Sequence, residues 1–137
     1  MKTLFLVCAL MSYCHLAVAQ TADYNVVFDI TSSDTNAHKT VVRQVKAISG
    51  ERADAKLEVV IYGGAIDLVL KDKSKHSAAI QELSKSGKAS FMVCEGTMKR
   101  NNISADQLVP GVTTVPDGIY EIISKQKQGW GYIKISP

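Results

Sequence analysis

The stretch FMVCEGTMKR, residues 91–100, joins an apolar run to a helix-forming segment through Cys94, Glu95 and Gly96. The longer run ASFMVC, residues 89–94, has the length and apolar content of a buried β-strand. We expect Glu95 to Thr97 to form a turn, and a short helix to begin at Met98. A strand that passes almost directly into a helix is typical of proteins in which strands and helices alternate.

The segments on either side of this stretch repeat the alternation. The other predicted strands are Tyr24 to Ile30, Leu57 to Tyr62, Val112 to Val115 and Tyr132 to Ile135. Apolar residues at helical spacing predict helices with inner faces at Ala37 to Ile48, Ala78 to Leu83 and Ile119 to Ile123, and helical turns at Ile66 to Leu70 and Ser104 to Leu108. Together these elements predict a three-layer α/β/α domain with a mostly parallel five-stranded sheet and right-handed crossovers.

The first 19 residues have the features of a secretory signal peptide. Lys2 gives a positive start, residues 4–10 form a short apolar core, and Ala17-Val18-Ala19 is a small-x-small cleavage site. The alternative is an uncleaved anchor, but the apolar core is short for a membrane span. We therefore expect cleavage after Ala19, a periplasmic or secreted protein, and one domain over residues 20–137.

The composition of the mature chain excludes several functional classes. Loss of the leader leaves 118 residues with 15 basic and 13 acidic side chains, a net charge of about +2. These charges are mixed along the chain rather than gathered in a stripe, so we expect no nucleic-acid partner. No second long apolar segment follows the leader, so we expect no membrane association after cleavage. No GxGxxG fingerprint or phosphate loop is present, and we expect no cofactor.

The cysteine count singles out one thiol. Cys8 and Cys14 lie in the leader, so Cys94 is the only cysteine of the predicted mature chain and has no intramolecular disulfide partner. In an oxidising compartment an unpaired cysteine is buried, paired with another chain, or chemically used. Free cysteine is also among the most buried residue types. The position of Cys94 in the sequence leaves all three readings open.

The predicted position of Cys94 is also compatible with a reactive role. Ligands of open parallel sheets bind beyond the carboxyl ends of the strands. A thiol placed where a strand meets a helix can be stabilised as thiolate by free backbone N–H groups, and Gly96 allows close approach of an anion. His38, in the first turn of the first helix, could tune such a thiolate or bind an anion, although such a residue is more often a solvated or capping side chain.

Other candidate sites are weaker. His76 lies in the lysine-rich run KDKSKHS, which is most simply a solvated helix entry. A zinc site built from Cys94, His38 and His76 would lack a close ligand pair, so we expect no metal. The aspartates are too scattered for a paired-carboxylate mechanism. Tyr120, Trp130 and Tyr132 are expected mainly to pack the last helix and strand, with self-association through an exposed aromatic edge as the alternative.

The segments ASFMVCEGTMKRNNIS and LVPGVTTVPDGIYEIISKQKQGWGYIKI resemble the DsrE/DsrF-like family, in its exported single-domain branch. The VVFDIT opening and IYGGAIDLVL fit the same pattern, so the similarity covers about Tyr24 to Ile135. The resemblance implies a DsrE-like, flavodoxin-like α/β fold. It also implies a homo-oligomer, often of three or six subunits.

The resemblance also implies a function for the cysteine. Family members in sulfur relay carry a persulfide on a cysteine at the end of the third strand, and Cys94 falls at that place. A sulfurtransferase-like carrier would need a sulfur donor or acceptor, either a protein or a small sulfur compound. Residues expected to line the pocket are Asn36, His38, Gly63, Gly64, Glu95, Gly96, Thr97 and Pro116. The alternative is a non-catalytic oligomeric module that binds a small ligand or anion, with Cys94 as a packing residue.

Overall fold

The computed structural model describes residues 23–137, so the predicted leader, its cleavage site and its two cysteines lie outside the described residues. The strands are β1 (Asn25–Ile30), β2 (Lys56–Ile61), β3 (Ala89–Cys94), β4 (Thr113–Val115) and β5 (Gly131–Ile135). The helical elements are α1 (Thr35–Glu51), η1 (Gly63–Val69), α2 (Ser77–Lys85), α3 (Glu95–Arg100), η2 (Ala105–Gln107) and α4 (Gly118–Lys127). None of the helices described is long and apolar enough to cross a bilayer.

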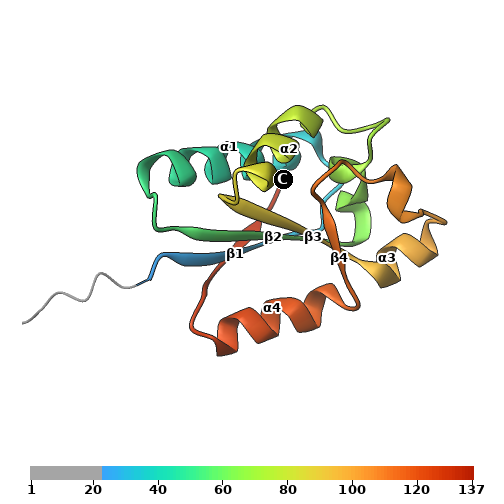
Figure 1. The fold of residues 1–137 in the computed structure, drawn as a ribbon. Coiled ribbons are helices and arrows are strands. Elements are labelled where there is room, and N and C mark those ends of the chain that lie inside the picture. The colour runs from blue at the N-terminus through green and yellow to red at the C-terminus, as the bar shows by residue number, and fades with distance from the viewer. Residues whose placement is uncertain (1–22) are drawn as a thin grey trace, which may run out of the picture.

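The five strands form one sheet in the order β4-β3-β2-β1-β5, and every neighbouring pair is parallel. The predicted parallel α/β sheet is therefore confirmed. The chain moves in one direction from β1 to β4 and then returns across the sheet to place β5 beside β1. Because crossovers between parallel strands are right-handed, this reversal puts the last helix on the opposite face. Helices α1 and α2 consequently cover one face, and α4 alone crosses the other (Figure 1).

The face beneath α1 and α2 carries the main hydrophobic core. Alternate strand residues point into it, among them Phe28, Val59 and Phe91, which have no exposed surface. Helix α1 contributes Val41 and Val45 at helical spacing, as the apolar pattern predicts. Burial of this continuous apolar layer is the principal source of stability for the fold.

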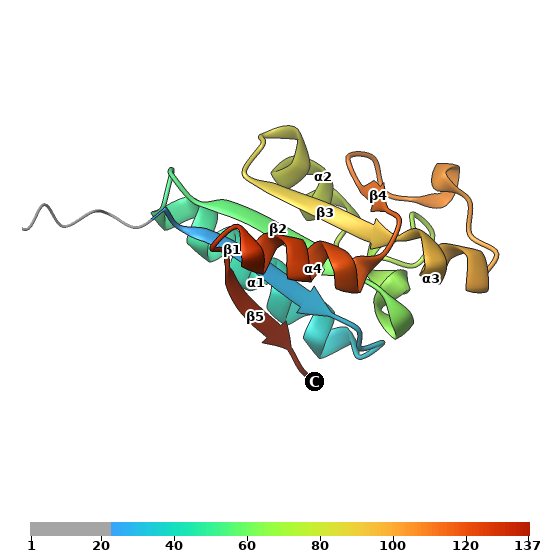
Figure 2. The same cartoon turned by 90° about the horizontal axis from the view of Figure 1, so that it is seen from below.

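The face beneath α4 is smaller and more polar. Its apolar cluster consists of Val27, Val60 and Ile122, with Tyr62, Met92 and Trp130 packed against it. Figure 2 shows α4 running alone across this face, with β5 and β4 to either side. Because side chains alternate along each strand, the same face also receives Asp29, Glu58 and Cys94.

Two local predictions differ from the structure. The short helix begins at Glu95 rather than at Met98, because Cys94 occupies the N-cap position and Gly96 adopts no positive φ that would interrupt the first turn. The inner face predicted for the last helix is wrong in part: Ile122 is buried, but Ile119 is 57% exposed and Ile123 43%, and Tyr120, expected to pack this helix, is 70% exposed on the outer side of α4. The capping box of Ser104 and Gln107 is confirmed at η2, and the helical turn expected near Ile66 is a 3₁₀ helix.

Candidate functional site

Cys94 ends β3 at a point where two helices begin. The backbone N–H groups of Gly96 and Thr97, in the first turn of α3, and of Gly118, the first residue of α4, lie close enough to its thiol to lower the pKa of that thiol. The residue is 9% exposed, so the sulfur lies just beneath the surface. Three converging N–H groups form a cradle suited to an anionic sulfur atom.

The neighbouring backbone N–H groups change the acidity of the thiol. Burial on its own raises the pKa of Cys94, but the backbone N–H groups of Gly118, Thr97 and Gly96, together with the side chain of Thr97, outweigh it. They hold the pKa below its ordinary value of 9.0. The thiolate fraction at neutral pH is therefore larger than for a free cysteine. The thiolate is the nucleophilic form of cysteine.

Gly118 allows the two helix starts to meet at Cys94. A Cβ atom at this residue would lie 3.2 Å from Cγ1 of Val60, 3.3 Å from Cβ of Cys94 and 3.4 Å from Cδ1 of Tyr62. The preceding Asp117 caps α4 by accepting a hydrogen bond of 2.9 Å from the backbone N–H of Tyr120. The expected pocket included Pro116 but not Gly118. A glycine directly after an N-cap aspartate was the available signal, since glycine is a poor helix former.

The side-chain hydroxyl of Thr97 connects the turn after β2 with the start of α3, next to the thiol. Its Oγ1 accepts hydrogen bonds of 3.0 Å from the backbone N–H of Gly63 and 3.2 Å from Nη2 of Arg100. Thr97 has no exposed surface. Gly63 has a φ of 59°, which favours glycine at this position. Of the expected pocket residues, Gly63, Gly96 and Thr97 are thus linked to Cys94 directly or through one hydrogen bond.

Gly96 leaves open space between Cys94 and a positive charge. The point that a Cβ atom would occupy at this residue lies 3.6 Å from Sγ of Cys94 and 3.7 Å from Nη1 of Arg100. An atom placed near that point would contact both the thiol and the guanidinium group. The neighbouring Glu95 turns toward β4, where its Oε1 accepts a hydrogen bond of 3.3 Å from Thr114.

The remaining expected pocket residues lie elsewhere. Pro116 is exposed in the link from β4 to α4. Gly64 packs against the loop after β1, where a Cβ atom would lie 3.1 Å from the carbonyl oxygen of Thr31. Asn36 and His38 line a separate cavity whose lining residues do not include Cys94. His38 belongs to α1, on the other side of the sheet from α4, so the expected single pocket is divided between two places (Figure 1).

A buried acidic network on the α4 face was missed from the sequence. Asp29 is 5% exposed and accepts hydrogen bonds of 2.7 Å from the hydroxyl of Tyr132 and 2.9 Å from Nζ of Lys134. The bond to Asp29 raises the pKa of Tyr132 to about 12. Burial, followed by the charge of Asp29 and then that of Cys94, raises the pKa of Tyr62. The signal for this network was an acidic residue inside an apolar strand, paired in register with Lys134 on β5.

A second acidic residue is buried toward the amino end of the same face. Glu58 is 1% exposed, and its Oε2 lies 2.8 Å from Nζ of Lys125 on α4. The same ammonium group lies 3.4 Å from Glu121. Burial raises the pKa of Glu58 above its ordinary value, and the second carboxylate reinforces the shift. Within residues 23–137, no three acidic, histidine or cysteine side chains are grouped to hold a metal ion.

Comparison with known proteins identifies the family. The model of the DsrE/DsrF-like family matches residues 25–135. A protein of unknown function from Methanobacterium thermoautotrophicum, MTH1491, is 29% identical with a TM-score of 0.76, and the match covers 82% of this chain and 99% of that chain.

Two more distant structures share the fold alone. The ychN protein of E. coli is 12% identical with a TM-score of 0.66, covering 80% of this chain and 96% of that chain. BT1422 of Bacteroides thetaiotaomicron is 16% identical with a TM-score of 0.66, covering 85% of this chain and 98% of that chain. No curated protein matches the chain. Because the family model spans nearly all of the described residues, the chain belongs to the DsrE/DsrF-like family.

Proposed function

We propose that the protein is a periplasmic or secreted sulfur carrier that holds a sulfane sulfur atom as a persulfide on Cys94. Membership of a family associated with sulfur relay supports the general role. The observation that carries the specific one is the convergence of three backbone N–H groups on Cys94, which lowers the pKa of its thiol. A site arranged in this way favours a sulfur anion over a neutral packing side chain.

The proposed transfer needs no external oxidant or reductant. The Cys94 thiolate attacks the outer sulfur of a donor R–S–SH, and a new S–S bond forms as the donor S–S bond breaks. The donor leaves as R–S⁻ with the bonding electron pair, and Cys94–S–SH remains. An acceptor thiolate then attacks the outer sulfur, takes it away as a persulfide, and releases the Cys94 thiolate again. Sulfur moves at each step while the number of electrons is conserved.

Each group at the site has a role in this exchange. The N–H groups of Gly96, Thr97 and Gly118 stabilise the Cys94 thiolate before attack and again when it is the leaving group. The space above Gly96 accommodates the outer sulfur, and Arg100 lies on the far side of that space to balance its negative charge. The side chain of Thr97 holds Arg100 in this position.

The test is the mass of the intact protein after exposure to polysulfide, with and without reductant. We expect a gain of one or more sulfur atoms that is lost on reduction and absent from Cys94→Ala. The variant must keep the circular dichroism and thermal unfolding of the original protein. Sulfur loading that persists in a folded Cys94→Ala protein would exclude Cys94 as the carrier.

The low exposure of Cys94 favours a second candidate function. In that alternative the protein is a non-catalytic oligomeric module for a small ligand or anion, and Cys94 is a packing residue. A packed thiol reacts with iodoacetamide only after unfolding, whereas a carrier thiol reacts in the native protein. Pairing of Cys94 between subunits would instead give a dimer on a denaturing gel that disappears on reduction.

We further propose that the chain assembles as a homo-oligomer, as a trimer or hexamer. Three apolar side chains of α4 point away from the sheet: Ile119 is 57% exposed, Tyr120 70% and Ile123 43%. Together with Tyr132 on β5 they form an outer apolar surface of the α4 layer, and such surfaces are typical of contacts between proteins. Light scattering coupled to size exclusion measures the assembly directly.

A further inference from the structure

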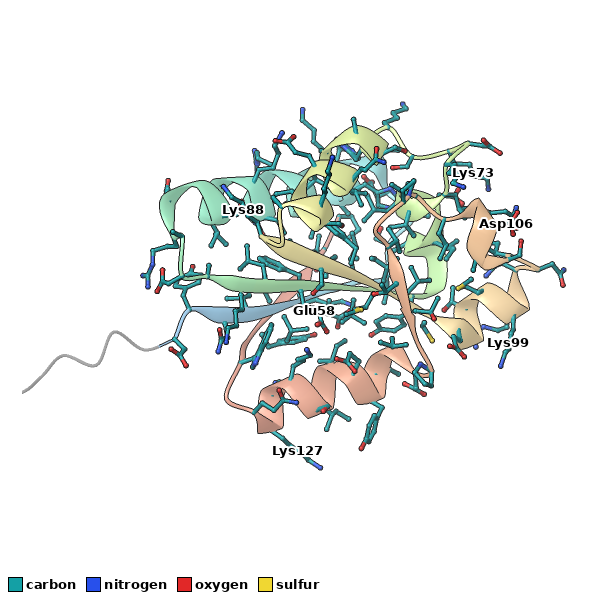
Figure 3. The ribbon with its side chains drawn as sticks, in the orientation of Figure 1. Glu58, Lys73, Lys88, Lys99, Asp106 and Lys127 are labelled. Carbon is teal, nitrogen blue, oxygen red and sulfur yellow. The ribbon has the colours of Figure 1, made fainter. Side chains whose placement is uncertain are left out.

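The cavity lined by Asn36 and His38 lies on the side of the sheet opposite to Cys94. It is bounded by the start of α1, by η1 and by the loop that leads into α2, and its volume is about 320 Å³. That size is within the range of small-ligand sites. Figure 3 shows Lys73 of this loop on the α1 and α2 side of the molecule, whereas Glu58 lies on the α4 side. None of the residues that line this cavity is assigned to sulfur transfer.

The charges around the cavity are predominantly positive. Lys39, Lys73 and Lys75 line it, while its only acidic lining residue is Asp67. Asp67 is occupied by Lys73, with 3.0 Å between Oδ1 and Nζ. For the other two lysines no salt bridge exists with any residue in the described part of the chain. Two uncompensated ammonium groups at the mouth of a cavity attract an anion and repel a metal cation.

Two histidines also line the cavity. His38 is 6% exposed, and its Nε2 donates a hydrogen bond of 2.9 Å to the carbonyl oxygen of Ser32. Its Nδ1 has no side-chain or backbone partner among residues 23–137, which leaves this atom for a ligand. Burial first, and then the positive charges of His38, Lys39 and Lys75, lower the pKa of His76. His38 therefore lies close enough to His76 for its charge to act on that imidazole.

We propose that this cavity binds a small oxyanion of the phosphate or sulfate class, either as the free ion or as the terminal group of a larger molecule. Lys39 and Lys75 supply charge, and the side chains of Ser33, Asn36 and Ser74 supply hydrogen-bond donors. A bound dianion offsets the positive charges that lower the pKa of His76, so binding is accompanied by proton uptake at His76.

The test is calorimetric titration of the folded protein with inorganic phosphate in a chloride buffer. We expect saturable binding that Lys75→Gln and His76→Gln each weaken about tenfold, the loss of one charge-assisted contact. Lys127→Gln is the matched control, because this lysine is exposed on α4 away from the cavity (Figure 3). Equal weakening by Lys127→Gln, or the absence of saturable binding, would overturn the proposal.

Additional titrations distinguish the possible ligands from one another, and distinguish this cavity from the site at Cys94. Sulfate and a phosphate monoester are compared with inorganic phosphate, and tighter binding of the monoester identifies the terminal group of a larger molecule. Repeating the titration near pH 6.5 in buffers of different ionisation enthalpy measures proton uptake, which we expect to fall in His76→Gln. Cys94→Ala must bind phosphate as the original protein does; a parallel loss would place the anion at the thiol instead.

Discussion

The two faces of the sheet bury different kinds of side chain. Beneath α1 and α2, Phe28 and Phe91 belong to one continuous apolar core without exposed surface. Beneath α4, the apolar cluster is small, and the buried carboxylates of Asp29 and Glu58 share the layer with the thiol of Cys94. Apolar burial stabilises a fold, whereas a buried charge needs a partner to offset its desolvation. One face therefore supplies most of the stability, and the other holds the Cys94 thiol.

The connectivity explains this division. Only the last crossover, from β4 to β5, reverses direction, so only α4 is available to cover its face. A single helix cannot bury five strands. The buried carboxylates on this face therefore need hydrogen-bond or ion-pair partners, and neighbouring side chains must provide them. Lys134 and Tyr132 do so for Asp29, and Lys125 does so for Glu58. Because α4 crosses this face, its first residue, Gly118, lies against Cys94.

The largest expected effect on the free energy of unfolding comes from truncating a side chain in the layer beneath α1 and α2. Phe91→Ala should lower the free energy of unfolding by about 3–5 kcal/mol, because it removes a fully buried ring from close packing. Ile122→Val, beneath α4, should cost only about 0.5–1.5 kcal/mol. Urea unfolding followed by circular dichroism measures both changes, and Phe91→Leu gives an intermediate point if the alanine variant does not fold. A loss well below about 3 kcal/mol for Phe91→Ala would contradict the close packing of the layer beneath α1 and α2.

Removing the partner of Glu58 should have the next largest effect. Lys125→Met leaves this buried carboxylate without its ammonium group, at a cost of about 2 kcal/mol near neutral pH if the group then takes up a proton. The double variant with Glu58→Gln should recover most of the loss, since no charge is left buried. Unfolding free energies of the single and double variants form the test. If the double variant is no more stable than Lys125→Met, the loss comes from packing of the lysine stem and not from charge.

The pH dependence of stability gives a separate test of Glu58. Its pKa in the folded protein is raised, by burial above all, from an ordinary value of 4.5. The folded state therefore binds more protons than the unfolded state above pH 4.5, and this group's contribution to stability falls as the pH rises through the raised pKa. We expect Glu58→Gln to remove that fall. An unchanged pH profile of the unfolding free energy would assign the dependence to other groups.

A smaller effect on stability, with a larger one on reactivity, is expected at Thr97. Thr97→Val removes the hydroxyl that helps to lower the pKa of Cys94 and that accepts a hydrogen bond from the N–H of Gly63. The pKa of the Cys94 thiol should rise, and the protein should lose about 1 kcal/mol of stability. Rates of iodoacetamide reaction across pH locate the thiol pKa, and Thr97→Ser is the matched control that keeps the hydroxyl. A thiol pKa that is the same in all three proteins would contradict the assigned role.

Features set by local pattern could be predicted from the sequence. The apolar runs placed the strands within one or two residues, and the position of Cys94 at the end of β3 followed from its run alone. Gly63, Gly96 and Thr97 were placed near the thiol because parallel strands end at the same edge of a sheet.

Contacts that depend on the order of the strands in the sheet could not be predicted from local sequence patterns. The approach of Gly118 to Cys94 depends on α4 crossing the opposite face, which follows only from the return of the chain to β5. His38 was expected beside the thiol, but α1 lies on the other side of the sheet. The pairing of Asp29 with Lys134 likewise joins strands that are far apart in the sequence.

The smallest effect on folding is expected on the outer side of α4. Ile119→Ser and Ile123→Ser change side chains that are 57% and 43% exposed, so each should alter the unfolding free energy of the monomer by less than about 0.5 kcal/mol. If this surface joins subunits, the same substitutions should shift the mass in solution toward the monomer, because contacts between proteins depend on a few buried apolar anchors. Lys127→Gln, on the same helix, should leave the mass unchanged. If neither isoleucine change alters the mass in solution, the subunits associate through another surface. The covering of this sheet face by α4 alone would then play no part in assembly.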